Sequence, residues 1–390
     1  MYAVLKRSAQ VSAFFFCCDT QCAVPVKMIG EEGITVKQTI SQKMTDVLTT
    51  VGFAVAAIAA ALLIGGAFVA VMGYDVGLSM SMLIQGAVGS VSAISETFVK
   101  ATPLIFTGLS YAMARRCGVV NLGIEGQVYM GGLLGTVAAI YLAGLPAPLH
   151  ILLSVAAAFV GGGVLGALVM FLKNRFGATE LITTIMFNYI AMYLVDLLVN
   201  GPLKDPAGTD AQSVMVPQSA QLPRLISGTR FHLGIVLAVL CVLFYHFFLS
   251  RTKQGYEIRV VGSNLTAAEY AGIHTQSRAL LAMFIAGGFG GLAGGVEILA
   301  TQLRLFPNFS NNYGWDGIAV ALLGNGSAGG IIPSALLFGA LRSGATRMQM
   351  KAHTPAAVIS VIQAIIILLV VGKSLLVKLN RQRKLKKAGG

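Results

Sequence analysis

The stretch ELITTIMFNYIAMYLVDLLVN, residues 180–200, is apolar along most of its length and carries charged side chains only at Glu180 and Asp196. A helix needs about 20 consecutive, mainly apolar residues to cross the hydrocarbon core of a bilayer, and this stretch reaches that length. It therefore predicts a membrane-spanning helix. Its centre nevertheless contains Asn188 and Tyr189, which are polar groups at the depth where polar groups cost most.

Similar apolar stretches lie on both sides of this one. The chain has 390 residues, of which 56% are hydrophobic and 11% charged, whereas a soluble domain carries about 25% charged residues. We therefore expect one polytopic membrane domain, with little chain left for a soluble catalytic domain. The predicted spans are 47–72, 97–114, 119–143, 149–172, 180–200, 231–250, 279–300 and 356–372, and an extra crossing at 78–95 remains an alternative.

The region 315–341 is rich in glycine and contains a proline, so it predicts two half-helices joined by GNGSAGG, a re-entrant element. Such breaks are tolerated where they face protein or a water-filled path. The predicted fold is an all-α transmembrane bundle of about eight to ten spans, with a broken or re-entrant helix near 315–341. The membrane domain would cover 47–378, between an N-terminal cytoplasmic tail, 1–46, and a basic cytoplasmic tail, 379–390.

The formal net charge of +13 is spread along the chain in short runs and not gathered in one cluster, which argues against a nucleic-acid partner. Lys and Arg mark cytoplasmic loops. Basic residues lie at the ends of three predicted spans, at Arg115/Arg116, Lys173/Arg175 and Arg251/Lys253. They are also frequent in the C-terminal residues 373–387. This alternation predicts that both termini are cytoplasmic and that the number of crossings is even.

Small residues recur at the spacing that lets membrane helices approach closely. The GxxxG pairs are Gly131/Gly135, Gly162/Gly166, Gly287/Gly291, Gly290/Gly294 and Gly291/Gly295. GGGVLG at 161–166 also matches a dinucleotide-binding pattern, but no strand precedes it, so helix packing is the better interpretation. The five cysteines form no CxxC pair, and we expect no metal site, no cofactor and no catalytic residue.

The stretch GVVNLGIEGQVYMGG, residues 118–132, places a carboxylate inside an apolar region. A charged group at the bilayer centre costs about 2.5–3.5 kcal/mol, so Glu125 should face protein, water or an interface. Two interpretations remain open: a structural polar network near Arg115 and Arg116, or a wall of a translocation pathway. The candidate pathway residues are Asn121, Glu125, Gln127, Asn188, Tyr189 and Asp316.

The predicted loop 251–278 is the longest on the cytoplasmic side. Within it, TAAE forms a capping box in which Thr266 would cap a helix and Glu269 would reach back to its amide. Gly272 suits the end of that helix. The pattern predicts a helix of under two turns outside the membrane, either a docking helix for a cytoplasmic partner or a solvated surface turn.

Four segments together resemble the permease subunits of bacterial ABC importers for nucleosides and simple sugars, which are related to ribose and branched-chain amino acid permeases. They are GVVNLGIEGQVYMGG, ELITTIMFNYIA, GYEIRVVGSNLTAAEYAGI and GIAVALLGNGSAGGIIPSALLFGALRSGA, in family order. The resemblance extends from about 47 to 378. It implies alternating access in the bacterial inner membrane, a partner ATPase with two cassettes, a second permease subunit and an extracytoplasmic substrate-binding protein or lipoprotein.

The resemblance also implies that residues 255–273 form the segment that couples the permease to the ATPase. The candidate coupling residues are Gly255, Tyr256, Glu257, Arg259, Thr266, Glu269, Tyr270 and Gly272. Two alternatives remain at this point. One is an ion-coupled secondary transporter using carboxylates such as Glu125, Glu297 and Asp316, and the other is an ABC permease for branched-chain amino acids.

Overall fold

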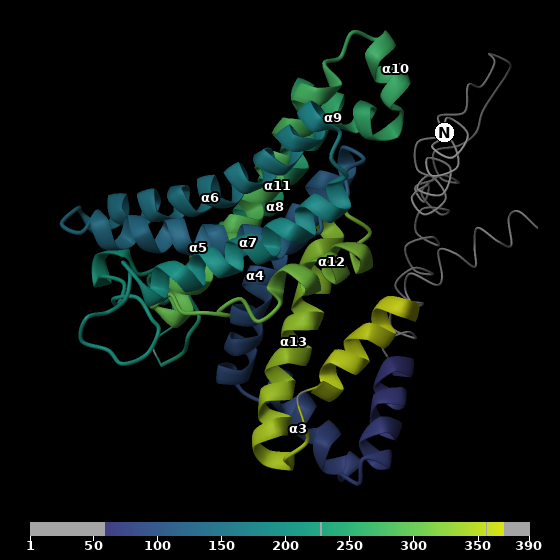
Figure 1. The fold of residues 1–390 in the computed structure, drawn as a ribbon. Coiled ribbons are helices and arrows are strands. Elements are labelled where there is room, and N and C mark those ends of the chain that lie inside the picture. The colour runs from purple at the N-terminus through teal and green to yellow at the C-terminus, as the bar shows by residue number, and fades with distance from the viewer. Residues whose placement is uncertain (1–58, 227, 356, 370–390) are drawn as a thin grey trace, which may run out of the picture. The chain divides into compact units, whose positions relative to one another are not determined.

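The computed structural model describes residues 59–226, 228–355 and 357–369, and the description below concerns the compact unit Ala61–Ile367. Helices make up its regular structure, and the described residues contain no strand beyond two isolated bridges. The helices are α3 (Val76–Val88), α4 (Val91–Arg116), α5 (Ile124–Tyr141), α6 (Ala147–Phe176), α7 (Glu180–Asn200), α8 (Gly234–Arg251), α9 (Lys253–Ser263), α10 (Leu265–Tyr270), α11 (Thr275–Val296), a π-helix (Glu297–Gln302), α12 (Tyr313–Leu323) and α13 (Ala328–Ala352), with Ala59–Val71 and Ala357–Leu369 at the two ends. The predicted all-α bundle is confirmed (Figure 1).

Four of these helices are long and apolar enough to cross a membrane: α6, α7, α8, and α11 with its π-helical continuation. The bent pair α3 and α4 makes a fifth candidate if it counts as one span. The bounds of α7 agree with the prediction. The predicted tails, 1–46 and 379–390, and the start of the first predicted span lie outside the described residues.

Several predicted boundaries differ from the structure; the span expected at 97–114, for example, begins at Val91. The span expected at 119–143 begins only at Ile124, because Gly118 has a φ of +76° and the chain turns before the helix starts. The segment considered as an extra crossing at 78–95 is the 13-residue α3 followed by a bend of 79° into α4. At about 1.5 Å per residue, α3 is too short to cross a bilayer.

The predicted break near 315–341 is present, but its second half is longer than expected. The 11-residue α12 ends at a turn in which Asn325 and Gly326 both have positive φ. Ser327 then caps α13, its hydroxyl accepting the Gly330 N–H at 3.1 Å. Because α13 continues for 25 residues, it is a full-length helix and not a half-helix.

Glycines let α11 pack directly against α5 and α6. A Cβ added to Gly162 would overlap the backbone of Gly287, and one added to Gly131 would overlap the backbone of Gly291. Gly294 meets the Val128 carbonyl in the same way. The interpretation of these glycines as packing residues is confirmed, and they make α5, α6 and α11 the tightly fitted centre of the bundle.

Candidate translocation and coupling sites

Three of the six predicted pathway residues line a common cavity of about 370 Å³. They are Glu125 from α5 and the neighbouring Asn188 and Tyr189 from α7, and Tyr189 lies near the midpoint of α7. The other lining residues are Tyr129, Met192, Asn308, Asn311, Asn312 and Trp315. We call this space the α7 cavity. Its size is at the lower end of the range typical of small-molecule sites.

Two buried polar groups form the floor of the α7 cavity, and both are held by backbone hydrogen bonds. Glu125 Oε2 accepts the Gly314 N–H at 2.7 Å, so a carboxylate from α5 sits at the N-terminus of α12. Asn188 accepts the Gly126 N–H at 2.7 Å and donates to the Leu122 carbonyl at 2.9 Å. These bonds fix the angle between α5, α7 and α12.

Asn121 and Gln127 do not line the cavity but form a closed network with Ser110. Asn121 Nδ2 donates to Gln127 Oε1 at 3.1 Å, and the Ser110 hydroxyl donates to the same oxygen at 3.2 Å. Asn121 Oδ1 also accepts the Gly123 N–H at 3.0 Å. All three side chains are buried, and their bonds join α4 to the turn that precedes α5, which is the geometry of a structural network.

Asp316 forms an ion pair and does not line the α7 cavity. Its Oδ2 lies 2.8 Å from Arg342 Nη2 on α13, which also donates to the Asn311 carbonyl at 2.9 Å. The guanidinium carbon is 4.6 Å from the centroid of the Tyr313 ring. Arg342 thus ties α12 and the segment before it to α13. Arg342 was not predicted from the sequence, although an Arg between the apolar residues and glycines of FGALRSGA is a usable signal.

The wall formed by Asn308–Asn312 was also missed. It belongs to the irregular segment 303–312, which follows the π-helix at the end of α11. Asn308, Asn311 and Asn312 all have positive φ, between 50° and 63°. Gln302 joins this segment to the buried Glu297, since its Nε2 donates to Glu297 Oε1 and to the Phe309 carbonyl, both at 3.0 Å. The clustered asparagines of NFSNNYGW were the available signal.

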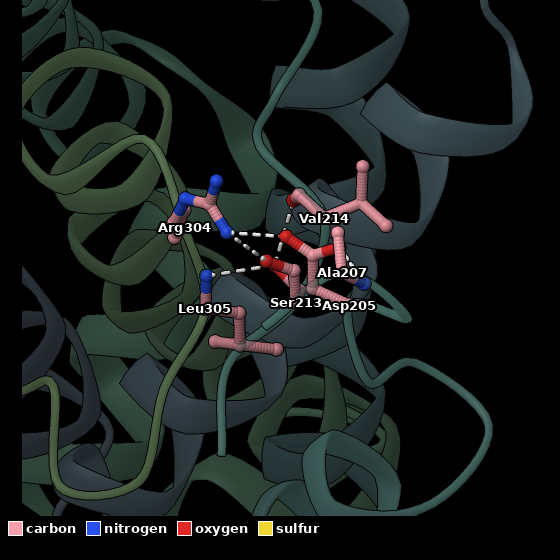
Figure 2. A network of polar contacts seen from close by, with 6 residues as sticks. All are labelled: Asp205, Ala207, Ser213, Val214, Arg304 and Leu305. Carbon is pink, nitrogen blue, oxygen red and sulfur yellow. Dashed lines mark hydrogen bonds and ion pairs between the residues drawn. The ribbon is translucent and has the colours of Figure 1, made fainter. Parts of the chain in front are cut away.

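A polar network fastens the segment 303–305 to the long connection between α7 and α8 (Figure 2). Arg304 Nη1 donates to Asp205 Oδ2 at 2.7 Å, and Ser213 Oγ accepts the Leu305 N–H at 2.9 Å. The Ser213 N–H donates back to the Leu305 carbonyl at 2.8 Å. The connection therefore holds the start of the segment whose later residues form the cavity wall.

We expect Asp205→Asn to loosen this network. The Arg304 guanidinium holds the pKa of Asp205 below its usual value, so the ion pair contributes stability above the unfolded pKa of about 3.9, and this stability is lost as pH falls through the lowered folded pKa. The melting temperature of Asp205→Asn should therefore lie below that of the parent at pH 7, and the two should converge in acid. Asp210→Asn, an exposed carboxylate of the same connection, is the control. Equal melting curves of Asp205→Asn and the parent at pH 7 would show that the pair stabilises nothing.

The predicted short helix of the 251–278 loop is present as α10, but its cap is a different residue. Asn264 accepts the Ala267 N–H through Oδ1 at 3.0 Å, so the capping box expected at Thr266 is wrong. The predicted stop is confirmed. Gly272 has a φ of +75°, and the Gly272 and Ile273 N–H groups donate to the Glu269 and Ala268 carbonyls, a Schellman motif.

The eight candidate coupling residues divide into buried and exposed sets. Gly255 and Glu257 face the protein, where Glu257 pairs with Arg278 of α11. The exposed residues are Tyr256, Arg259, Thr266, Glu269, Tyr270 and Gly272. Ala268 is fully buried against its own chain, whereas Tyr270 is 90% and Leu265 55% exposed. Figure 1 shows α9 and α10 at the far end of α8 from the 201–233 connection.

Within the described residues, no group of three or more His, Cys, Asp or Glu side chains could hold a metal ion. The described cysteines, Cys117 and Cys241, are free thiols.

Comparison with known proteins identifies relatives over most of the chain. Residues 93–371 match the family described as "Branched-chain amino acid transport system / permease component". The chain is 36% identical to the guanosine ABC transporter permease protein NupP of Bacillus subtilis, over 78% of this chain and 88% of the relative. It is 31% identical to the nucleoside ABC transporter permease protein NupB of Lactococcus lactis, over 83% and 92%.

A third relative is the glucose ABC transporter permease protein TsgB13 of Haloferax volcanii, 30% identical over 82% of this chain and 87% of the relative. No solved structure matches the chain. The family match spans more than half of the chain and agrees with the apolar helices and their glycine packing. This chain belongs to the branched-chain amino acid transport system permease family and is a membrane permease component of an ABC transporter.

Proposed function

We propose that this permease serves an importer of nucleosides or simple sugars, works by alternating access, and depends on a partner ATPase with two cassettes for hydrolysis. The observation that carries the substrate class is the lining of the α7 cavity: carboxamide, phenol and indole side chains, with one carboxylate. Such groups suit a neutral molecule with many hydroxyl groups. The relatives named for guanosine, nucleosides and glucose support the same class.

The same lining disfavours branched-chain amino acids. A zwitterionic amino acid needs a cation or a free helix N-terminus for its carboxylate. No Lys, Arg or His lines the described cavity, and the N-terminus of α12 already holds the Glu125 carboxylate. An ion-coupled secondary transporter is not favoured, because the family is one of ABC permeases. Asp316, one of its coupling carboxylates, is paired with Arg342.

A second permease subunit is proposed to cover the α7 cavity. α7 has an exposed stripe on the face that carries Tyr189; its other members are Ile182, Met186, Tyr193 and Leu197. Apolar side chains alone could face lipid. The asparagine carboxamides and Trp315 line the adjoining cavity, however, and exposing polar groups to hydrocarbon costs free energy. A protein surface on this face, and not lipid, would keep the cavity wet and polar.

The proposed test is uptake by the complete transporter, assembled with its partner ATPase, second permease subunit and binding protein. Labelled uridine, guanosine and glucose are compared, with leucine as competitor. We expect import of a nucleoside or of glucose that requires ATP and is insensitive to leucine. Import of leucine with no import of nucleosides or glucose would refute the substrate class, and import without ATP would refute the partner ATPase.

Both termini are proposed to be cytoplasmic, in the inner membrane of a bacterium, with α9 and α10 on the ATPase side and the 201–233 connection facing the binding protein. The basic tail and the positions of Arg115/Arg116, Lys173/Arg175 and Arg251 at helix ends support this orientation.

This orientation predicts the behaviour of reporter fusions. A reporter that is active only in the cytoplasm should be active when fused after Lys387 and inactive when inserted at Thr209 of the 201–233 connection. The two sites serve as controls for each other, since each should give the opposite result with a reporter that is active only outside the cytoplasm. The reverse pattern would invert the proposed topology.

A further inference from the structure

The α7 cavity has a buried polar floor and an exposed aromatic rim. Glu125, Asn188 and Tyr129 are 5%, 4% and 3% exposed, while Tyr189 and Trp315 are 51% and 43% exposed. A molecule entering the cavity would therefore meet two aromatic side chains first and fixed hydrogen-bonding groups below them. This arrangement differs from a smooth aqueous channel, which needs no oriented polar floor.

The floor is held in place before any ligand arrives. Both ends of the Asn188 carboxamide bond to backbone groups around α5, and one oxygen of Glu125 bonds to Gly314. The Tyr129 ring packs edge-on against Phe309, with 4.9 Å between centroids. A carboxylate has about four acceptor positions, so Glu125 retains capacity to accept from a ligand N–H or O–H. A preformed site loses less entropy on binding.

The asparagine wall combines an unusual backbone with retained side chains. Asn308, Asn311 and Asn312 adopt left-handed conformations in which glycine would be less strained. Asparagine tolerates this conformation and, unlike glycine, places a donor and an acceptor in one plane at the cavity wall. All three side chains are exposed to the cavity opening and not buried in the bundle.

We propose that the α7 cavity is a nucleoside-binding site within the permease itself, in which Tyr189 and Trp315 take the face of the base and the asparagines read its edge. The inference rests on the proposed function, since it selects one of the two substrate classes named there. Aromatic side chains stack on bases of any kind, and carboxamides pair with the donor and acceptor edge of a base. Glu125 would accept from a ribose hydroxyl or a base N–H.

A simple sugar would use this site less fully. A sugar has hydroxyl groups that can pair with the floor and with the carboxamides, but it has no planar base for the aromatic rim. Stacking on aromatic side chains contributes to the binding of any base, so a molecule without a base would bind this site more weakly. Substrate selection would thus occur in the membrane as well as in the binding protein.

Trp315 offers a direct measurement, because it is the sole tryptophan of the chain. The permease is purified with its second permease and ATPase but without the binding protein, as parent and as Trp315→Phe. The difference between their fluorescence signals isolates Trp315 from the tryptophans of the partners. Guanosine and glucose are then titrated into both complexes. In parallel, ATP-driven uptake of each compound is measured with the same complexes in vesicles to which the binding protein has been added.

Two variants test the wall without straining the backbone. Asn308→Gly and Asn311→Gly keep the left-handed conformation and remove only the carboxamide. Asn325→Gly is the matched control, because Asn325 has a φ of 53° but belongs to the turn between α12 and α13, outside the cavity. Correct assembly of each variant is checked by its basal ATP hydrolysis.

We expect guanosine to change the Trp315 signal saturably, each cavity variant to raise the half-saturating concentration about tenfold, Asn325→Gly to leave it unchanged, and glucose not to compete. An unresponsive Trp315, or unshifted cavity variants, in a complex that imports guanosine would overturn the site and leave the proposed function standing. Equal competition by glucose would overturn the nucleoside assignment. A parent complex that imports neither compound would overturn the proposed function and this inference together.

Discussion

Gly291→Leu should abolish the folded permease. A Cβ on Gly291 would overlap the Ala158 carbonyl and the backbone of Gly162, and Gly131 approaches Gly291 from α5. The substitution would therefore force α11 away from α6 at their closest approach. In a membrane no hydrophobic effect drives the helices back together, because lipid is as apolar as leucine, so the lost backbone contact has no substitute.

The expected measurement is the yield of monodisperse complex after mild detergent extraction, which should fall to background for Gly291→Leu. Gly329→Leu is the matched control: Gly329 is also helical, in the first turn of α13, and nothing lies within 4 Å of an added Cβ. The control should purify and melt like the parent. A Gly291→Leu complex with the parent's yield and melting temperature would show that the three helices are not packed through these glycines.

Features that depend on local composition were predictable from sequence. The number of consecutive apolar residues predicted the bounds of α7. The four-residue spacing of glycines identified the surfaces where α11 meets α5 and α6. Gly272 ended α10 as expected, because a left-handed residue is needed there whatever surrounds it. Each of these signals lies within one helix or one turn, so the structure it predicts does not depend on contacts with distant parts of the chain.

The α7 cavity could be predicted only in part, because tertiary contacts place its wall. Glu125 and Asn188 stood out as polar groups in apolar stretches, and both line it. Asn121 and Gln127 gave the same signal, yet their carboxamides bond to each other and do not line the cavity. The segment 303–312 has no periodic pattern, and its position depends on Ser213 and Asp205, which are distant in sequence.

The cap of α10 shows how local signals compete. Asn264 and Thr266 are both good N-cap residues, and a helix can start at either. Starting at Asn264 adds two residues to the helix and places Ala268 in full contact with its own chain. The exposed surface proposed for docking is then carried by Leu265 and Tyr270, not by Ala268, so a proline at Ala268 would disturb internal packing.

Tyr270→Asp, combined with Leu265→Asp, should uncouple the permease from its ATPase. The two side chains are 90% and 55% exposed on a helix that is itself firmly attached, since Asn264 caps it and Ala268 is buried beneath it. A large aromatic side chain at the centre of an interface commonly contributes 2 kcal/mol or more, which corresponds to roughly thirtyfold weaker association. A new carboxylate in an apolar groove would weaken association further.

The route from this surface to the α7 cavity is continuous in the structure. Glu257 of α9 pairs with Arg278 near the start of α11, and α11 continues through the π-helix to Gln302, which holds the Phe309 carbonyl of the cavity wall. If the ATPase docks on α9 and α10 as proposed, a movement of these helices would reach the wall along α11. Packed elements of this kind switch between discrete arrangements.

The double variant should insert and purify normally, because both residues lie outside the candidate membrane spans. Substrate-stimulated ATP hydrolysis and uptake should fall to background. Tyr141→Asp is the control: Tyr141 is 69% exposed and ends α5, on the opposite side of the membrane in the proposed topology. Retained co-purification with lost stimulation would place the defect in transmission through α9 and α11, and loss of co-purification would place it in docking. Transport equal to the parent would mean that α10 is only a connector, and the ATPase would then have to reach the permease through another surface.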